Sequence, residues 1–195
     1  MNPMKFFSIV ISMSAIVGFF ACGNNVGEAY YDSNNQFSDL VKDLNEQFSE
    51  NAGYQSIMIS YDEIMGNTIL VKVSRDINKN KIEEWFYMNG AWDKKADTTL
   101  QLENKSPSDF LFSLKNDYDI SKLVDLVKNS KNRVKDELKV NEVVCKSVNL
   151  LMRNKRVSEN KMDDLITQIT IEPLEGGISY NLSYDAEGNL KDMTK

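Results

Sequence analysis

The sequence predicts an α+β fold made of two tandem repeats, each a helix packed on an antiparallel sheet of three to four strands. Each half of the chain opens with an apolar stripe at helical spacing and continues with segments that alternate apolar and polar residues. The two stripes also begin alike, with FSDLV at 37–41 and ISKLV at 120–124. Asn89-Gly90 indicates a tight hairpin, because both positions of a type I′ turn require positive φ.

The first repeat is predicted to span residues 36–103. Its helix carries one apolar stripe, formed by Phe37, Leu40, Val41, Leu44 and Phe48. Ser33, Asn34 or Asn35 can cap the start of this helix, and Gly53 is placed to end it. Four strands follow, around residues 57–61, 69–73 and 82–88 and from Ala91 toward Leu102.

The second repeat is predicted to span residues 104–195. Ser106-Pro107 indicates a helix start, and the segment 110–114 fits either helix or a short strand. A firmer helix carries its apolar residues on one side: Ile120, Leu123, Val124, Val127, Val134 and Leu138. Strands are expected at 144–152, 165–172, 178–184 and 190–193.

This element order, together with the final hairpin YDAEGNL at 184–190, loosely resembles the tandem α+β modules of bacterial envelope proteins such as PepSY-like domains. The resemblance covers the topology of residues 36–195. It implies a fold and transfers no functional residue.

The first 22 residues resemble a bacterial lipoprotein signal. A short charged start that includes Lys5 is followed by an apolar run over 6–20 and by Ala21-Cys22-Gly23. The run is shorter than the roughly 20 apolar residues that a membrane-spanning helix needs. Phe19 departs from the aliphatic residue usual at its position.

This resemblance implies that residues 1–21 are a signal peptide and that Cys22 carries the lipid, with palmitate among the acyl chains. Residues 22–35 would then be a lipidated flexible tether. Gly23 after the cysteine resembles lipoproteins sent to the outer membrane, facing either the periplasm or the cell surface.

The chain is acidic and lacks histidine. Removing residues 1–21 would leave 174 residues with a formal charge of −7, which argues against a nucleic-acid partner. The absence of histidine excludes Ser-His-Asp chemistry and imidazole metal ligands. Cys145 has no expected partner and fits a small buried apolar residue. We therefore expect no metal and no cofactor.

An aspartate-led segment at 76–80 begins like a calcium loop, but Lys81 stands where the loop needs glycine and Tyr87 where it needs glutamate. Four acidic doublets keep open the alternative of an enzyme that uses carboxylates: Asp62-Glu63, Glu83-Glu84, Asp136-Glu137 and Asp163-Asp164. Neighbouring residues in a strand or helix point apart, so these doublets fit a solvated surface better than a catalytic pair.

The hairpin at Asn89-Gly90 places Trp85, Tyr87 and Trp92 on one face. If the preceding turn has five residues, Val71 pairs with Trp85 and this face lies in the core; a four-residue turn would turn the face outward as a contact patch. In the core, replacing either tryptophan by alanine should cost about 3–5 kcal/mol.

Basic residues are concentrated in 128–161, where ten Lys or Arg stand against four Asp or Glu. They would form either a solvated face or a basic surface for anionic headgroups or another acidic partner. The candidate residues are Lys128, Lys131, Arg133, Lys135, Arg153, Lys155 and Arg156.

From these observations we expect a non-catalytic, lipid-anchored protein of the cell envelope. Its partners would be the membrane, through the lipid on Cys22, and another envelope component, a peptide or a glycan. The alternatives are a carboxylate-dependent envelope enzyme and a structural or assembly accessory subunit.

Overall fold

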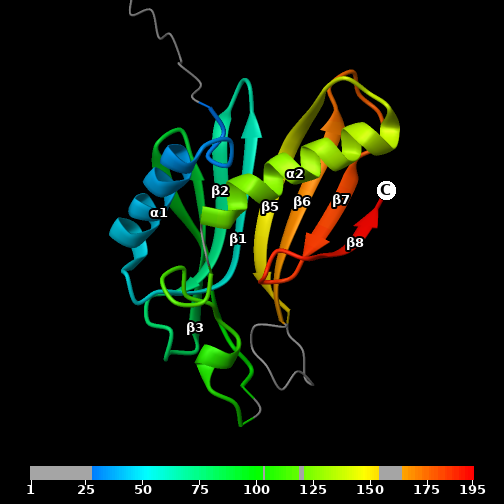
Figure 1. The fold of residues 1–195 in the computed structure, drawn as a ribbon. Coiled ribbons are helices and arrows are strands. Elements are labelled where there is room, and N and C mark those ends of the chain that lie inside the picture. The colour runs from blue at the N-terminus through cyan, green and yellow to red at the C-terminus, as the bar shows by residue number, and fades with distance from the viewer. Residues whose placement is uncertain (1–27, 103, 119–120, 154–163) are drawn as a thin grey trace, which may run out of the picture.

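A single antiparallel sheet runs through the chain, with both helices on one of its faces (Figure 1). The structure, a computed structural model, describes residues 28–102, 104–118, 121–153 and 164–195. Within these residues eight strands are ordered β4-β3-β2-β1-β5-β6-β7-β8. The elements are α1 (Asn34–Phe48), β1 (Gly53–Asp62), β2 (Gly66–Ser74), β3 (Lys81–Met88), β4 (Ala91–Thr99), the 3₁₀ helix η1 (Pro107–Asp109), α2 (Ser121–Leu138), β5 (Val143–Met152), β6 (Leu165–Pro173), β7 (Tyr180–Tyr184) and β8 (Leu190–Thr194).

The predicted fold class is wrong in its architecture. Two separate helix-on-sheet repeats were expected, but β1 pairs with β5, with Ile57 opposite Leu150 and Ile59 opposite Val148. The fold is therefore mainly β, one eight-stranded sheet with two helices. The physical reason is that β1 and β5 would each be an open edge in separate sheets, and pairing them satisfies both rows of backbone groups. The division at residues 103 and 104 stays a prediction.

Helix α1 forms where its apolar stripe and its cap predict it. Ser33 Oγ accepts a hydrogen bond from the Gln36 backbone N–H at 3.3 Å, and Phe37, Leu40 and Leu44 are buried. The helix ends at Ser49, whose φ is 100°, and not at Gly53. Gly53 opens β1 instead, and glycine is needed there because a Cβ would lie 2.7 Å from the Ile77 side chain.

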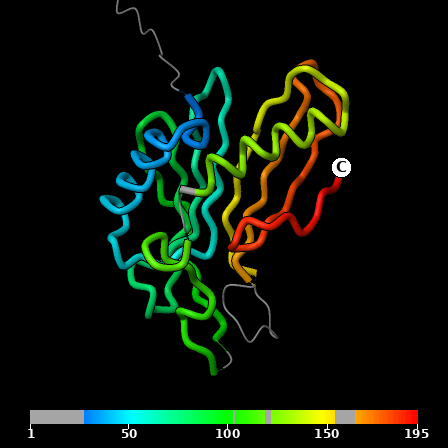
Figure 2. The backbone as a smooth tube through the Cα atoms, viewed as in Figure 1, coloured from blue at the N-terminus to red at the C-terminus, as the bar shows by residue number. Residues whose placement is uncertain are grey.

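Helix α2 lies across the strands of the second half, as Figures 1 and 2 show from the same side. Its buried face combines aliphatic residues such as Leu123, Val127 and Val134 with one hydroxyl, that of Ser130. Ser130 Oγ lies 2.7 Å from the hydroxyl of Tyr184 on β7. A second buried hydroxyl pair joins Tyr118, before α2, to Thr167 on β6 at 3.1 Å. Polar groups are thus satisfied inside an otherwise apolar layer.

Two sequence expectations about the loops are resolved by the structure. Asn89 and Gly90 have φ of 53° and 80°, as a type I′ hairpin requires. A short helix, η1, does start after Ser106, and in the segment 110–114, left open between helix and strand, Phe112 forms an isolated antiparallel bridge with Tyr54. The two backbones exchange hydrogen bonds of 2.8 and 2.9 Å there.

The packed body begins before α1. Ala29 and Tyr31 are each only 1% exposed, and the Tyr31 hydroxyl donates a hydrogen bond to the Cys145 backbone oxygen at 2.8 Å. These residues belong to the segment that the sequence assigned to a tether, so its described part is held in place. No helix among the described residues is long and apolar enough to cross a membrane.

Candidate functional site

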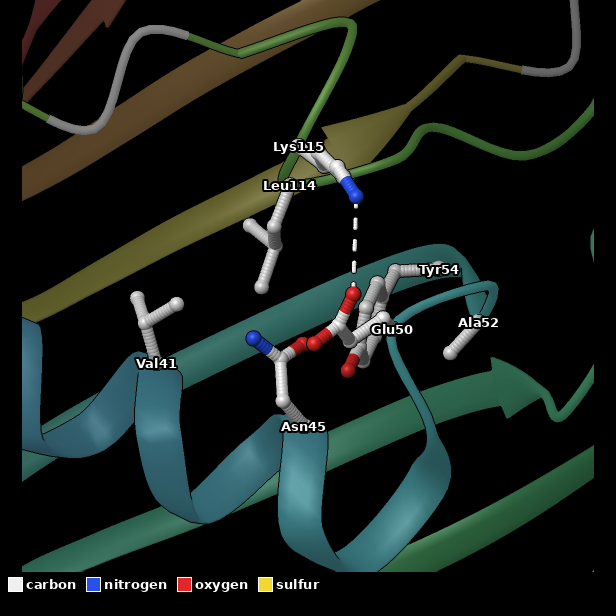
Figure 3. Close-up of a pocket in the computed structure, with 7 residues that line it drawn as sticks. All are labelled: Val41, Asn45, Glu50, Ala52, Tyr54, Leu114 and Lys115. Carbon is white, nitrogen blue, oxygen red and sulfur yellow. Dashed lines mark hydrogen bonds and ion pairs between the residues drawn. The ribbon is translucent and has the colours of Figure 1, made fainter.

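A cavity of about 380 Å³ opens between α1 and the segment that follows η1 (Figure 3). Helix α1 supplies two lining residues one turn apart. The others come from the loop after α1, from the start of β1 and from the segment after η1. The lining residues are Val41, Asn45, Glu50, Ala52, Tyr54, Leu114 and Lys115. The walls combine apolar side chains with one amide, one hydroxyl and one pair of opposite charges.

Tyr54 reaches this cavity because of an irregularity in β1. The pairing of β1 with β2 shifts register between Tyr54 and Ser56. This bulge lets Tyr54 join Ile57 in the core, although strict alternation would put the two residues on opposite faces. Its ring packs against Phe112 at 5.9 Å and edge-on to Phe48 at 6.5 Å between ring centroids.

The Tyr54 hydroxyl is buried and has no hydrogen-bond partner among the described residues. Burial raises the pKa of Tyr54, so the phenol is neutral at all ordinary pH values and can donate one hydrogen bond. Leaving such a group unpaired costs free energy, on the order of 1–3 kcal/mol. An orphaned donor beside a cavity is therefore the feature of this site that folding alone does not explain.

An ion pair lies over the cavity. Lys115 Nζ is 3.4 Å from Glu50 Oε2, and the two side chains are 67% and 71% exposed. Figure 3 shows this ion pair between Glu50 and Lys115, with the Asn45 side chain pointing toward Glu50 from α1. Exposed ion pairs contribute about 0–1 kcal/mol, so a ligand could displace Glu50 at little cost.

The residues predicted as a contact patch lie together on the face covered by α1. Val71 pairs with Trp85 and Tyr87 with Trp92, the register that a five-residue turn predicts. The Phe48 ring is 5.8 Å from Trp85 and 5.1 Å from Trp92, both edge-on. The three aromatic residues of the hairpin are partly buried and pack against the core.

A charged network fixes Trp85 in that position. Glu83, only 9% exposed, accepts hydrogen bonds from Trp85 Nε1 at 2.9 Å, Arg75 Nε at 3.0 Å and Lys94 Nζ at 3.1 Å. Burial opposes ionisation of Glu83, but these donors and the Arg75 charge outweigh it and lower the pKa of the carboxyl. Arg75 also donates to the Gln47 backbone oxygen near the end of α1 at 3.0 Å. The near-buried Glu83 carboxylate is therefore explained by its role in holding Trp85 and α1 in place, and we assign it no ligand or catalytic role.

The candidate basic residues are divided between two places. Lys128, Lys131, Arg133 and Lys135 lie on α2, where Lys131 Nζ contacts Asp32 Oδ1 at 2.8 Å. Arg153 follows the far end of β5, a strand about 30 Å long by its ten residues. Lys155, Arg156 and the lipidation candidate Cys22 lie outside the described residues.

A second hollow, of about 450 Å³, lies at the end of the sheet that contains the β1–β2 turn. It is lined by the residues Ala29, Tyr31, Asp32, Tyr61, Asp62, Glu63, Ile64, Lys131, Val144, Cys145, Lys146, Glu172, Pro173, Leu174 and Gly176. Burial raises the pKa of the Cys145 thiol to about 12, which makes it a poor nucleophile.

Several acidic side chains line this second hollow. Hydrogen bonds from the Ile64 and Met65 backbones lower the pKa of Asp62, so this carboxylate stays ionised and is a poor general acid. Among the described residues, no three His, Cys, Asp or Glu side chains form a group that could hold a metal ion.

Sequence reasoning missed the cavity at Tyr54. The alternation of Ile57, Ile59 and Tyr61 predicted the strand. Extended back to Tyr54, the same alternation puts this residue on the opposite face, because it takes no account of the bulge between Tyr54 and Ser56. Leu114 and Lys115 reach the site only through the pairing of Phe112 with Tyr54. The one available signal was an aromatic residue directly after Gly53 at the start of a strand.

No family model matches the chain, and no curated protein is similar to it at a significant level. The resemblance to PepSY-like modules therefore stays a prediction. Among solved structures, the fold is similar to the crystal structure of a "putative lipoprotein" from Clostridium difficile 630, with 13% sequence identity and a TM-score of 0.47. The match covers 81% of this chain and 91% of that one.

Proposed function

We propose that this chain is a non-catalytic, lipid-anchored protein of the cell envelope that binds an amide-bearing envelope component, a peptide or an N-acetylated glycan, at the Tyr54 cavity. The observation that carries the binding proposal is the buried, unpartnered Tyr54 hydroxyl beside a cavity of ligand size. The outer membrane is the favoured location, on the basis of Gly23 after the cysteine.

The lipid anchor is supported by the signal-like segment that ends at Cys22. Only five residues separate Cys22 from the described chain at Glu28, and the six residue steps between them span at most about 22 Å. An acyl group on Cys22 would hold the packed body close to the membrane surface. Because a single acyl chain binds membranes only marginally, the proposal includes more than one.

The cavity chemistry supports an amide as ligand. A neutral phenol can donate to a carbonyl oxygen, and the Asn45 side chain offers both a donor and an acceptor. Val41, Ala52 and Leu114 provide apolar walls for a methyl or methylene group. A ligand that displaces the exposed Glu50 side chain meets the hydroxyl and supplies its missing partner.

The anchor is tested by fractionating cells that produce the wild type or Cys22→Ala. We expect the wild type in the membrane fraction with incorporated palmitate, and the variant without label and released from the membrane. A Cys22→Ala protein that stays in the membrane fraction like the wild type would refute the lipid anchor.

The cavity is tested by titrating the protein with N-acetylglucosamine tetramer and, separately, with acetyl-tetraalanine amide, followed by NMR of backbone amides near Gly53. Binding of one probe alone identifies its class as the ligand. Tyr54→Phe should weaken binding by about 2- to 12-fold, the loss of one neutral hydrogen bond. Its stability should be unchanged or higher, because an unpaired buried hydroxyl is removed.

The matched control is Tyr61→Phe, in the same strand but away from the cavity. This variant should bind either probe like the wild type. Absence of binding by both probes at millimolar concentration, or equal binding by Tyr54→Phe and the wild type, would contradict the assignment of the cavity.

A further inference from the structure

Exposed apolar side chains gather in two turns at one end of the sheet. Ile64 and Met65, in the β1–β2 turn, are 83% and 53% exposed, and Leu174 and Ile178, in the β6–β7 turn, are 52% and 61% exposed. The other exposed large hydrophobic residues of the described chain, Met58 and Met88, are less exposed, at 38% and 37%. Large exposed apolar residues that cluster in this way mark an interaction surface.

The two turns flank the same hollow. Ile64 from one turn and Leu174 from the other both line the second hollow, of about 450 Å³. Figure 1 shows both turns at the upper end of the sheet, whereas the β2–β3 and β7–β8 turns lie at the lower end. This arrangement follows from the antiparallel order, in which alternate turns share an end.

The described chain begins at that same end. The Asn67 side chain, just after the β1–β2 turn, donates to the Glu28 backbone oxygen at 3.0 Å and accepts from the Tyr30 backbone N–H at 2.9 Å. Residue 28 is therefore held beside Asn67, at the start of β2. With five residues between them, Cys22 can lie no more than about 22 Å from Glu28.

The β1–β2 turn is built to hold its apolar residues outward. Asp62 Oδ1 accepts hydrogen bonds from the backbone N–H groups of Ile64 at 2.8 Å and Met65 at 3.1 Å. This local carboxylate–backbone motif fixes the turn while both side chains face solvent. The exposure of Ile64 and Met65 therefore belongs to a turn whose conformation is fixed by hydrogen bonds.

From this placement we infer that the end of the sheet formed by the two turns rests on the lipid bilayer, with Ile64, Met65, Leu174 and Ile178 inserted at the headgroup level. The inference rests on the proposed lipid anchor, whose short connection brings this end to the membrane. Glu63 and Glu175 flank these apolar side chains, and their negative charges would not be attracted to anionic headgroups. Insertion would therefore be driven by burial of the apolar side chains. Binding should therefore not require anionic lipid.

The test uses the full-length lipidated protein in phosphatidylcholine vesicles, with the environment-sensitive fluorophore NBD on single cysteines introduced by Ile64→Cys or Ile178→Cys. Matched controls are Asn78→Cys and Glu187→Cys, in the turns at the opposite end. Cys145 is only 6% exposed and should not react with the label. Vesicles with brominated acyl chains quench a fluorophore that enters the bilayer.

We expect a blue-shifted emission and loss of most of the fluorescence at positions 64 and 178 in brominated vesicles, with neither change at 78 and 187. Equal quenching at all four positions, or at none, in protein that floats with the vesicles overturns the inference and leaves the anchor intact. A blue shift without quenching indicates contact with a second protein copy and also overturns it. Protein that fails to float refutes the anchor itself.

Discussion

In the half of the sheet formed by β1–β4, α1 contacts the outer strands through aromatic rings at its C-terminal end. In the half formed by β5–β8, α2 contacts the strands along its length through aliphatic side chains and a buried hydroxyl. The single side chain of Phe48 packs against three rings, those of Tyr54, Trp85 and Trp92. On α2 the contact is shared by residues from Leu123 to Val134.

This difference shows that the two halves of the sheet can each pack against a helix although their strands differ in composition. The edge strand β4 is exposed at every residue except Trp92, and four of its nine residues are charged: Asp93, Lys94, Lys95 and Asp97. Charged edges resist pairing with other chains, but they offer little apolar surface to a helix. The Trp85 and Trp92 rings and the Glu83 network supply what aliphatic alternation supplies in the other half.

The largest expected effect follows from the concentration of contacts on Phe48. Phe48→Ala should lower the free energy of unfolding by about 3–5 kcal/mol, because a buried ring is removed from three aromatic neighbours. Urea denaturation followed by tryptophan fluorescence measures this loss. Asp39→Ala, on the exposed face of α1, should stay within about 0.5 kcal/mol of the wild type. A loss below 1 kcal/mol for Phe48→Ala would show that α1 does not depend on this ring.

An intermediate effect is expected for the hydroxyl pair under α2. Tyr184→Phe should cost about 1–3 kcal/mol if it leaves Ser130 without this partner in the core. Ser130 Oγ also contacts the Leu126 backbone oxygen at 2.7 Å, so the value should fall at the lower end of that range. The double variant Ser130→Ala/Tyr184→Phe should cost less than the sum of the single changes. Strict additivity in this double-mutant cycle would exclude coupling between the hydroxyls.

The smallest effect is expected from the pH dependence of the Glu83 network. Because the pKa of Glu83 is lowered in the folded protein, its contribution to stability is complete above the unfolded pKa of about 4.3 and is lost as the pH falls through the folded value. Glu83→Gln should therefore be less stable than the wild type at neutral pH, and the gap should narrow below about pH 4. Denaturation curves at both pH values measure it. A gap of constant size would contradict the ionised network.

Much of the local structure could be predicted from the sequence. The apolar stripes located both helices, Ser33 marked the start of α1, and the Asn-Gly pair located a hairpin. Alternation placed Ile57, Ile69 and Val71 in the core. These features depend on residues close together in the chain, so their pattern is visible without knowledge of the fold.

The candidate cavity could not be predicted, because its residues meet through irregular and distant contacts. A bulge beside Tyr54 changes the face of β1, and similar register shifts occur near Lys95 in β4 and Lys146 in β5. A two-residue period cannot show where such an extra residue is inserted.

By itself, the sequence determined the order of helices and strands, the inward face of strands with clean alternation such as β1 and β2, the acidic charge and the signal-like segment that ends at Cys22. Only the tertiary structure decided that β1 and β5 join the strands into one sheet, that Tyr54 is buried without a partner and that the apolar turns share an end with Glu28. Side-chain alternation specifies which face of a strand is buried, whereas the choice of neighbouring strand depends on backbone groups that are the same in every residue except proline.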